Sequence, residues 1–154
     1  HARTVECPLK LAQAAGEQLP FAAASFDVVL AKTVLCFVDD GQPFVSEMAR
    51  VLRPGGRFVI GELNKWSSWA AQRRVRAWSG SKLWQRGRFR TAGQLRRLAQ
   101  TAGLEVETMR GAVYYPRSRP AARCLAPLDI DFARITMLGA AFIAMAAVKP
   151  ADVA

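Results

Sequence analysis

Few side chains in this sequence have a type and spacing suited to chemistry. The one histidine, His1, is terminal, so neither a histidine-based catalytic triad nor a histidine metal site is expected. The cysteines, Cys7, Cys36 and Cys124, are odd in number and widely spaced, which fits neither a disulfide framework nor a zinc pattern. We therefore predict no metal site and interpret the cysteines as free thiols in a reducing cytoplasm.

Three other side chains are candidates for contact with a substrate. Glu62 ends an apolar segment, and Tyr114 and Tyr115 end a segment of alternating polarity. Core packing or an ordinary surface position is the alternative interpretation of each, since tyrosine is commonly half-buried. No two side chains are recognisable as a catalytic acid and base, so we assign no catalytic residue.

The composition predicts one globular domain. The chain has 154 residues, of which 51% are hydrophobic and 22% charged, enough for a single core and typical of folded proteins. Its longest apolar run, Met137–Val148, is too short to cross a bilayer as a helix. No basic start followed by an apolar segment opens the chain. We expect a cytoplasmic protein.

The elements that must position the candidate residues begin with a predicted strand, helix and strand. The apolar run Val28–Ala31 is typical of a strand buried on both faces. Residues 39–56 predict a helix with one apolar face, which Pro54 and the two glycines after it terminate. Residues 56–63, "GRFVIGEL", predict the second strand. This order predicts a βαβ unit, in which the two strands are parallel.

The other elements are predicted from N-cap residues, glycines that end helices, alternation of polar and apolar residues in strands, and proline content in loops. They are a short strand near Leu9–Ala12, a helix from Ser67 or Ser68 to about Trp78, a helix from Thr91 to Gly103, a strand at 104–115 and a loop or excursion at 116–129. Residues 139–150 fit a closing strand or a short buried helix, and the apolar run between Gly139 and Pro150 favours the strand.

Three motifs in this order resemble the second half of a class I S-adenosylmethionine-dependent methyltransferase. The stretch "GEQLPFAAASFDVVLAKTVLCFVDD" (16–40) resembles the family's segment between its third and fourth strands. "EMARVLRPGGRFVIGE" (47–62) is similar to the helix, turn and fifth strand of the type 11 group, and "AGLEVETMRG" (102–111) resembles the approach to the last hairpin. The resemblance implies a single α/β domain over 1–154 with a Rossmann-like, mostly parallel sheet. It also implies methyl transfer to a small molecule.

The resemblance further implies a set of residues for the cofactor, S-adenosyl-L-methionine. The family often has an acidic residue for the adenine amino group where this chain has Ala15, so we expect a backbone contact from Gly16 or a substitute contact from Glu17. The end of the fourth strand corresponds to Ala31, Lys32 and Leu35, which would form the wall of the cofactor site. For Ala31 and Leu35, simple core packing is the alternative interpretation.

The family's glycine-rich loop after the first strand, and the acidic residue that ends its second strand, have no counterpart in this sequence. We therefore expect an incomplete sheet that lacks the first two strands of the family order 3-2-1-4-5-7-6. The strand at Val28–Ala31 would then have an open apolar edge. A chain without these two anchors should bind the cofactor weakly and, by itself, be inactive.

Residues 64–90 hold all four tryptophans and follow the fifth strand, where the resembling family often has a lid over the substrate. They lie in the basic stretch 65–123, where fourteen Lys and Arg face two Glu and the net charge is +12. The lid interpretation makes Trp66, Trp69 and Tyr114 contacts of an apolar acceptor. Three alternatives remain open: an interfacial helix on an anionic membrane, a nucleic-acid surface, or a solvated arginine-rich face whose tryptophans pack on the sheet. The second functional hypothesis is accordingly a non-catalytic binding module.

Overall fold

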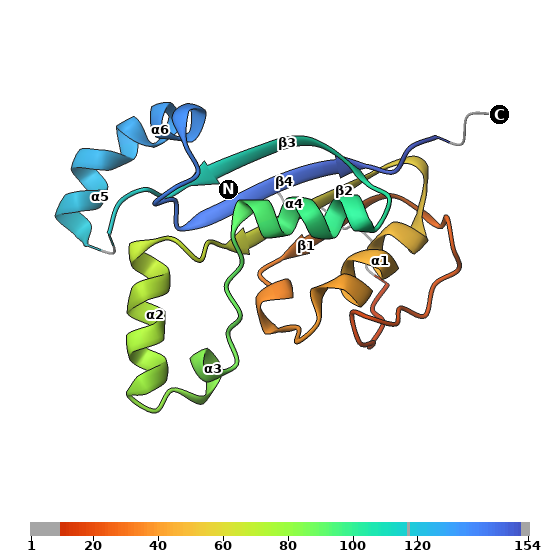
Figure 1. Cartoon of the computed structure of the whole chain (residues 1–154), viewed down its shortest axis with the longest axis horizontal. Coiled ribbons are helices and arrows are strands. Elements are labelled where there is room, and N and C mark those ends of the chain that lie inside the picture. The colour runs from red at the N-terminus through yellow and green to blue at the C-terminus, as the bar shows by residue number, and fades with distance from the viewer. Residues whose placement is uncertain (1–9, 117, 152–154) are drawn as a thin grey trace.

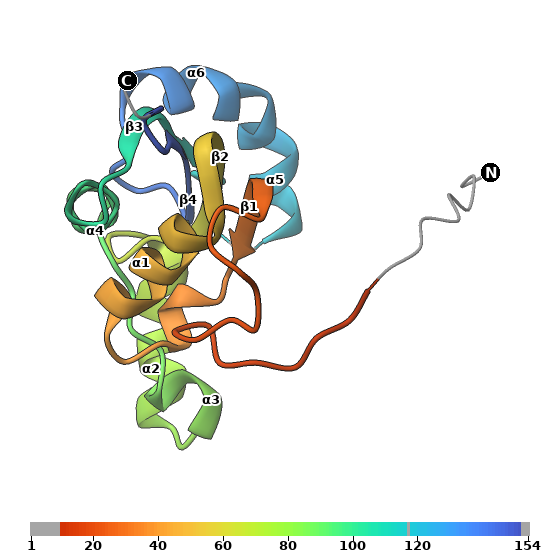
Figure 2. The ribbon, with the colours of Figure 1, turned by 90° about the vertical axis from the view of Figure 1, so that its right-hand side faces the viewer.

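The computed structural model describes residues 10–116 and 118–151, which form one open sheet with helices on both sides (Figures 1 and 2). The four strands have the order β1-β2-β4-β3. The elements are β1 (Phe26–Lys32), η1 (Leu35–Phe37), α1 (Gly41–Val51), β2 (Leu52–Leu63), α2 (Ser68–Trp78), α3 (Lys82–Gln85), α4 (Ala92–Thr101), β3 (Glu105–Ala112), α5 (Arg119–Leu125), η2 (Ala126–Leu128), α6 (Asp129–Ile135) and β4 (Phe142–Val148).

The predicted βαβ unit is confirmed. Strands β1 and β2 are parallel neighbours, with Val29 opposite Phe58, and α1 connects them. Asp40 caps α1 by accepting a hydrogen bond from the Gln42 amide, as an N-cap side chain does. Gly55, in the Pro-Gly-Gly turn, has φ of +76°, a conformation that costs glycine little. The strand assigned as β2 begins at Leu52, four residues before the predicted start.

Strands β2, β4 and β3 are antiparallel, so the sheet of the described residues is mixed. Ile60 of β2 lies opposite Met145 of β4, which lies opposite Met109 of β3. The order corresponds to strands 4-5-7-6 of the predicted arrangement, and the Rossmann-like α/β fold is confirmed. The mostly parallel character expected of the whole family sheet is not visible here, because the described part has one parallel pairing.

Helices α1 and α4 cover one side of the sheet, and α5 and α6 lie on the other (Figure 2). The core lies beneath α1 and α4, where Leu35, Phe58, Leu95 and Ile143 are almost wholly buried. This core supports the carboxyl ends of β1 and β2, which are the ends where parallel sheets bind ligands.

Two predictions about local structure are wrong. Residues 116–129, predicted as a loop because of three prolines, include α5 and η2 and lead into α6. Pro120 and Pro127 lie in the first turns of α5 and η2, where a missing N–H removes no helical hydrogen bond. Residues 10–12 form no strand, and Leu11 is 93% exposed. Leu9 lies outside the described residues.

The predicted open edge is present at β1. Among the described residues β1 pairs with β2 alone, and Val28 and Leu30 are 59% and 69% exposed. The alternation along β1 places both side chains on the sheet face opposite α1. An unpaired edge with an apolar face therefore remains at this side of the molecule.

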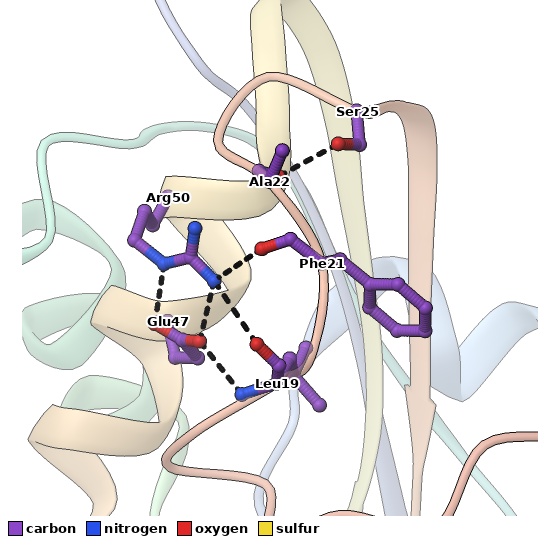
Figure 3. Close-up of polar contacts among 6 residues, drawn as sticks. All are labelled: Leu19, Phe21, Ala22, Ser25, Glu47 and Arg50. Carbon is purple, nitrogen blue, oxygen red and sulfur yellow. Dashed lines mark hydrogen bonds and ion pairs between the residues drawn. The ribbon is translucent and has the colours of Figure 1, made fainter.

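The segment before β1 is attached to α1 by polar contacts (Figure 3). The Glu47 carboxylate accepts a hydrogen bond from the Leu19 amide at 2.7 Å, and the Arg50 guanidinium donates to the Phe21 carbonyl at 2.8 Å. Hydrogen bonds from Arg50 lower the pKa of Glu47 to about 2. Two of the motifs quoted above, "LPF" and "EMARV", thus contact each other in the fold. In the described part of the chain, no helix is long and apolar enough to cross a membrane.

Candidate active site

A cavity of about 320 Å³ opens at the carboxyl ends of β1 and β2. Lys32 and Leu63 are the last residues of these strands and line it. Helix α2 contributes Trp69 and Arg73. The remaining lining residues come from the end of β3 and the start of β4: Ala112, Val113, Ala141 and Phe142. Four strands and one helix therefore converge on a single hollow with mostly apolar walls.

The position of α2 is determined by the chain that leaves β2. The Asn64 side chain is buried and donates to the carbonyls of Met137 and Ala140, which ties this chain to the start of β4. The Ser67 hydroxyl then caps α2 by accepting a hydrogen bond from the Ala70 amide at 3.1 Å. This confirms the predicted cap and directs the first turn of α2 over the strand ends.

Trp69 is held over the cavity by two kinds of contact. Its indole N–H donates to the Tyr115 carbonyl at 2.8 Å. The Arg73 guanidinium lies 5.5 Å from the centre of the Trp69 ring and 5.0 Å from that of Trp84, which are cation–π distances. The ring is therefore fixed in orientation, and the cation of Arg73 lies at the wall of the cavity.

Glu62 organises the loop that follows β1. Its side chain is buried, and its carboxylate accepts hydrogen bonds from the amides of Val34 at 2.9 Å and Leu35 at 2.7 Å. Thr33, just before them, has φ of +55°, a strained value for a β-branched residue. The carboxylate therefore holds this turn in place and satisfies two amides that otherwise lack acceptors.

Burial dominates the protonation of the groups around Glu62. It raises the pKa of the Glu62 carboxyl. It also raises the pKa of the Cys36 thiol to about 12, with the negative charge of Glu62 adding to the effect. Arg90 lies near both, and burial lowers the pKa of its guanidinium. The Arg90 side chain donates to the carbonyls of Leu35 and Val38. Cys36 is thus a protonated thiol, consistent with the free cysteine inferred from the sequence.

The predicted cofactor residues form two groups. Ala31 and Leu35 are 5% and 0% exposed and belong to the core, so their side chains offer no surface to a ligand, whereas Lys32 lines the cavity. Ala15, Gly16 and Glu17 lie in a turn closed by a hydrogen bond from the Gln18 amide to the Ala15 carbonyl. The assignment of these residues to the cofactor remains a prediction.

The two groups are connected through Phe44. A Cβ atom on Gly16 would lie 2.6 Å from the Phe44 ring, and Phe44 belongs to the same buried cluster as Leu35. Gly16 is therefore required for close packing of the turn on α1. Its backbone, and the exposed side chain of Glu17, are the groups that remain for a ligand.

The described residues fit S-adenosyl-L-methionine along one side. The cavity at the strand ends has apolar walls and room for part of such a molecule, and the turn at 15–17 stays the predicted contact of its adenine end. The chain contains no glycine-rich strand-to-helix loop that would hold the rest by close backbone approach. The described residues could therefore form one wall of a cofactor site.

The remaining predicted substrate residues lie in different surroundings. Trp66 is 56% exposed, and its ring contacts the Lys65 ammonium at 5.5 Å. The Tyr114 hydroxyl donates a hydrogen bond to the carbonyl of Thr136, which follows α6. Burial raises the pKa of the Tyr114 hydroxyl. Of the three predicted lid residues, Trp69 is the one that lines the cavity. Contact of Trp66 and Tyr114 with a substrate stays a prediction.

Six of the eight cavity residues were missed by the sequence reasoning, and Arg73 and Phe142 show why. Arg73 lies one helical turn after Trp69, so helical spacing alone would have placed it on the same face. Phe142 opens β4, and its ring fills the space where a Cβ atom on Gly61 would lie, at 2.5 Å. No signal in the sequence indicates this pairing, because it depends on the register between β2 and β4.

Comparisons with known proteins find methyltransferases among the similar sequences. Residues 1–60 match a family described as a methyltransferase domain, of the type 11 group. An uncharacterized protein of Mycobacterium tuberculosis is 35% identical over 142 residues, which are 92% of this chain and 48% of that protein. The ubiquinone biosynthesis O-methyltransferase of Idiomarina loihiensis is 33% identical over 98 residues, 60% of this chain and 40% of that enzyme.

Solved structures share the fold. A SAM-dependent methyltransferase of Thermotoga maritima, described as a possible histamine N-methyltransferase, has a TM-score of 0.65 at 21% identity, covering 88% of this chain and 62% of that chain. Geranyl diphosphate C-methyltransferase of Streptomyces coelicolor has a TM-score of 0.57 at 19% identity, and the match covers 87% of this chain and 50% of that enzyme's chain. The chain spans about half the length of the first curated relatives that it matches. By its motifs, the match of residues 1–60 and its strand order, the chain is similar to the type 11 group of the class I S-adenosyl-L-methionine-dependent methyltransferases, and it has their fold.

Proposed function

We propose that this protein transfers a methyl group from S-adenosyl-L-methionine, the cofactor of its family, to a small apolar acceptor. The observation that carries the proposal is the cavity at the carboxyl ends of β1 and β2, with Trp69 of α2 over it. An acceptor there would lie at the strand ends where the cofactor wall is predicted.

The walls of the cavity favour an acceptor with an apolar body and an acidic group. Leu63, Val113 and Phe142 offer apolar contact, and Trp69 offers a fixed indole face. Lys32 supplies a cation at the end of β1. A carboxylate or phosphate on the acceptor would be attracted to that ammonium, so charge and shape together would orient the molecule.

Methyl transfer requires alignment of the donor and acceptor more than it requires an acid or a base. When the sulfonium of the cofactor is bound, it supplies the methyl group and a neutral leaving group. The residues of this chain orient the acceptor and exclude water, and these effects lower the barrier by proximity. Helix α2 would therefore act as a lid, and no side chain needs to be assigned a proton-transfer role.

We further propose that the 154-residue chain by itself binds the cofactor weakly and has little activity. The glycine-rich loop is absent from its sequence, and in the part of the chain that the structure describes β1 has a neighbouring strand on one side only. Two lost hydrogen-bonded anchors should weaken binding on the order of a hundredfold. Calorimetric titration should show this weakness in the 154-residue chain and normal binding in a version extended upstream. Tight binding by the 154-residue chain would contradict the proposal.

The lid is tested with Trp69→Ala in the version that binds the cofactor, using labelled S-adenosyl-L-methionine and a panel of small aromatic and aliphatic carboxylic acids. Loss of the fixed indole should lower kcat/KM by about tenfold or more. Trp78→Ala is the matched control, since Trp78 lies on the same helix and is 86% exposed. Equal losses in both variants, or methyl transfer unaffected by Trp69→Ala, would refute the role of the cavity.

A further inference from the structure

Helix α2 presents two different faces. The inward face carries Trp69, Ala70 and Arg73, which line the cavity or are buried. The other face carries Ala71, Val75 and Trp78 at helical spacing i, i+4, i+7. Val75 is 58% and Trp78 86% exposed. The outward stripe is therefore apolar, faces solvent, and takes no part in the candidate active site.

Helix α3, beside α2, adds another exposed apolar side chain. Leu83 is 58% exposed, and α3 packs beside α2 through the bond from the Gln85 side chain to the Ala77 carbonyl. Figures 1 and 2 both show the pair of helices projecting away from the sheet. The exposed residues Val75, Trp78 and Leu83 are referred to below as the outer apolar patch. Its position at the tip of the molecule leaves it accessible to a large, flat partner.

The segment that carries the outer apolar patch is basic, and the exposed Asp39 carboxylate that lies beside Arg86 is paired with Arg88. Residues 63–104 contain ten Lys and Arg and no Asp or Glu. Arg76, Lys82 and Arg86 are exposed on α2, on α3 and just after α3, and among the described residues they form no ion pair. Exposed indole and aliphatic side chains on a basic segment match the chemistry of an interfacial segment on a negatively charged bilayer.

We propose that the outer apolar patch and the cations around it dock the protein on an anionic lipid membrane surface. Val75, Trp78 and Leu83 would enter the boundary between headgroups and acyl chains, and Arg76, Lys82 and Arg86 would contact lipid phosphates. The inference does not depend on methyl transfer, because the docking face and the cavity are on different faces of α2.

A nucleic acid fits these observations less well. Proteins that bind single strands offer aromatic rings on which bases stack. Here Trp69 and Trp84 are engaged with the Arg73 guanidinium. The patch also contains two aliphatic side chains, Val75 and Leu83, whose exposure serves no base stacking. Binding to the apolar part of a membrane would remove all three side chains of the patch from water, which is favourable.

The test is sedimentation of the 154-residue chain with phosphatidylcholine vesicles that contain or lack phosphatidylglycerol. We expect binding to the vesicles with phosphatidylglycerol, weakened by added salt, and a blue shift of tryptophan emission on binding. The double variant Trp78→Ser with Leu83→Ser should bind about tenfold more weakly or worse. Circular dichroism of each variant verifies that it is folded.

Two control variants distinguish loss of this docking surface from a general loss of exposed apolar side chains or of positive charge. Ile135→Ser with Leu138→Ser removes apolar side chains that are 79% and 70% exposed elsewhere, and should leave vesicle binding unchanged. Arg76→Glu with Arg86→Glu should abolish binding, whereas Arg96→Glu with Arg97→Glu, on α4 and with the same change of net charge, should reduce it far less.

Three results would overturn the proposal. The first is failure of the chain to bind the vesicles with phosphatidylglycerol. The second is an equal loss of binding in the patch variant and its control. The third is tighter binding to a labelled single-stranded RNA than to the vesicles, where the RNA binding depends on Trp78 to the same degree. The last result would assign the surface to nucleic acid.

Discussion

At the scale of single residues, Glu62 affects both the conformation of the loop after β1 and the protonation of the buried groups around it. Its carboxylate accepts hydrogen bonds from the amides of Val34 and Leu35, which fixes the loop that follows the cavity residue Lys32. The same burial that makes these hydrogen bonds valuable disfavours the negative charge. The Cys36 thiol is hydrogen-bonded to Glu62, and Arg90 lies near both, so one carboxyl group affects the loop conformation and the protonation of its neighbours.

The pKa of Glu62 is higher in the folded protein than in the unfolded chain, because burial raises it. Its protonation therefore stabilises the fold most at pH values below the ordinary pKa of glutamate, and this contribution is lost as pH rises through the raised folded pKa. Glu62→Gln stays neutral, so the unfolding free energy of the wild type relative to this variant should fall across that range. Urea unfolding at several pH values measures this difference.

Glu62→Leu provides the comparison for that experiment. It removes the acceptor and leaves the amides of Val34 and Leu35 buried without a partner, which should cost about 2 kcal/mol or more at every pH. A difference between the wild type and Glu62→Gln that does not vary with pH would show that the Glu62 carboxyl does not change protonation in the way proposed.

At the scale of elements, helix α2 depends on its cap more than on burial of its side chains. Helix α2 buries one residue nearly completely, Ala70, and projects from the body of the protein (Figure 1). A helix of this length is marginal in water, so tertiary contacts and the cap must stabilise it. Ser67 provides the cap and, through its hydroxyl bond to the Asn64 carbonyl, anchors the helix to the end of β2.

Ser67→Ala should therefore destabilise the protein by about 1 kcal/mol and loosen α2 over the cavity. Urea unfolding measures the first effect, and hydrogen exchange of the α2 amides measures the second. Ser68→Ala is the matched control, because Ser68 lies within the helix and provides no cap. Equal effects of the two substitutions would indicate that α2 is held by packing alone.

At the scale of the whole molecule, the sheet ends on an unprotected strand. Val28 and Leu30 are exposed along β1, whose outer backbone groups have no strand neighbour among the described residues. Such an edge is a template for pairing with another chain. The net charge of +10 opposes association by repulsion, so salt should promote it.

Leu30→Lys places a charge on this edge and should reduce association of the 154-residue chain, measured by sedimentation velocity over a range of protein and salt concentrations. Leu138→Lys changes an equally exposed residue away from the sheet and should have no such effect. If both variants associate like the wild type, contacts of β1 are not the cause of association.

The amino-acid sequence by itself determined the elements whose signals are local. Apolar periodicity placed α1, serine and threonine caps placed the starts of α2 and α4, and glycine with positive φ ended α4 at Gly103. The motifs "LPF", "EMARVLRPGG" and "AGLEVETMRG" identified the family, from which the strand order followed. The helices in 116–135 were missed because proline was read as a breaker, although at a first turn it is compatible with helix.

Tertiary structure alone decided which side chains meet at the strand ends. The cavity joins Lys32, Trp69 and Phe142, residues that lie far apart in the sequence and come together through strand register and the direction of α2. Burial, which changes the pKa of Glu62 and Cys36, is likewise a property of the assembled core. The same is true of the outer apolar patch, because a sequence shows that Trp78 is apolar but not that it remains in water after folding. Local patterns encode local backbone geometry, whereas contact and exposure depend on how distant segments pack.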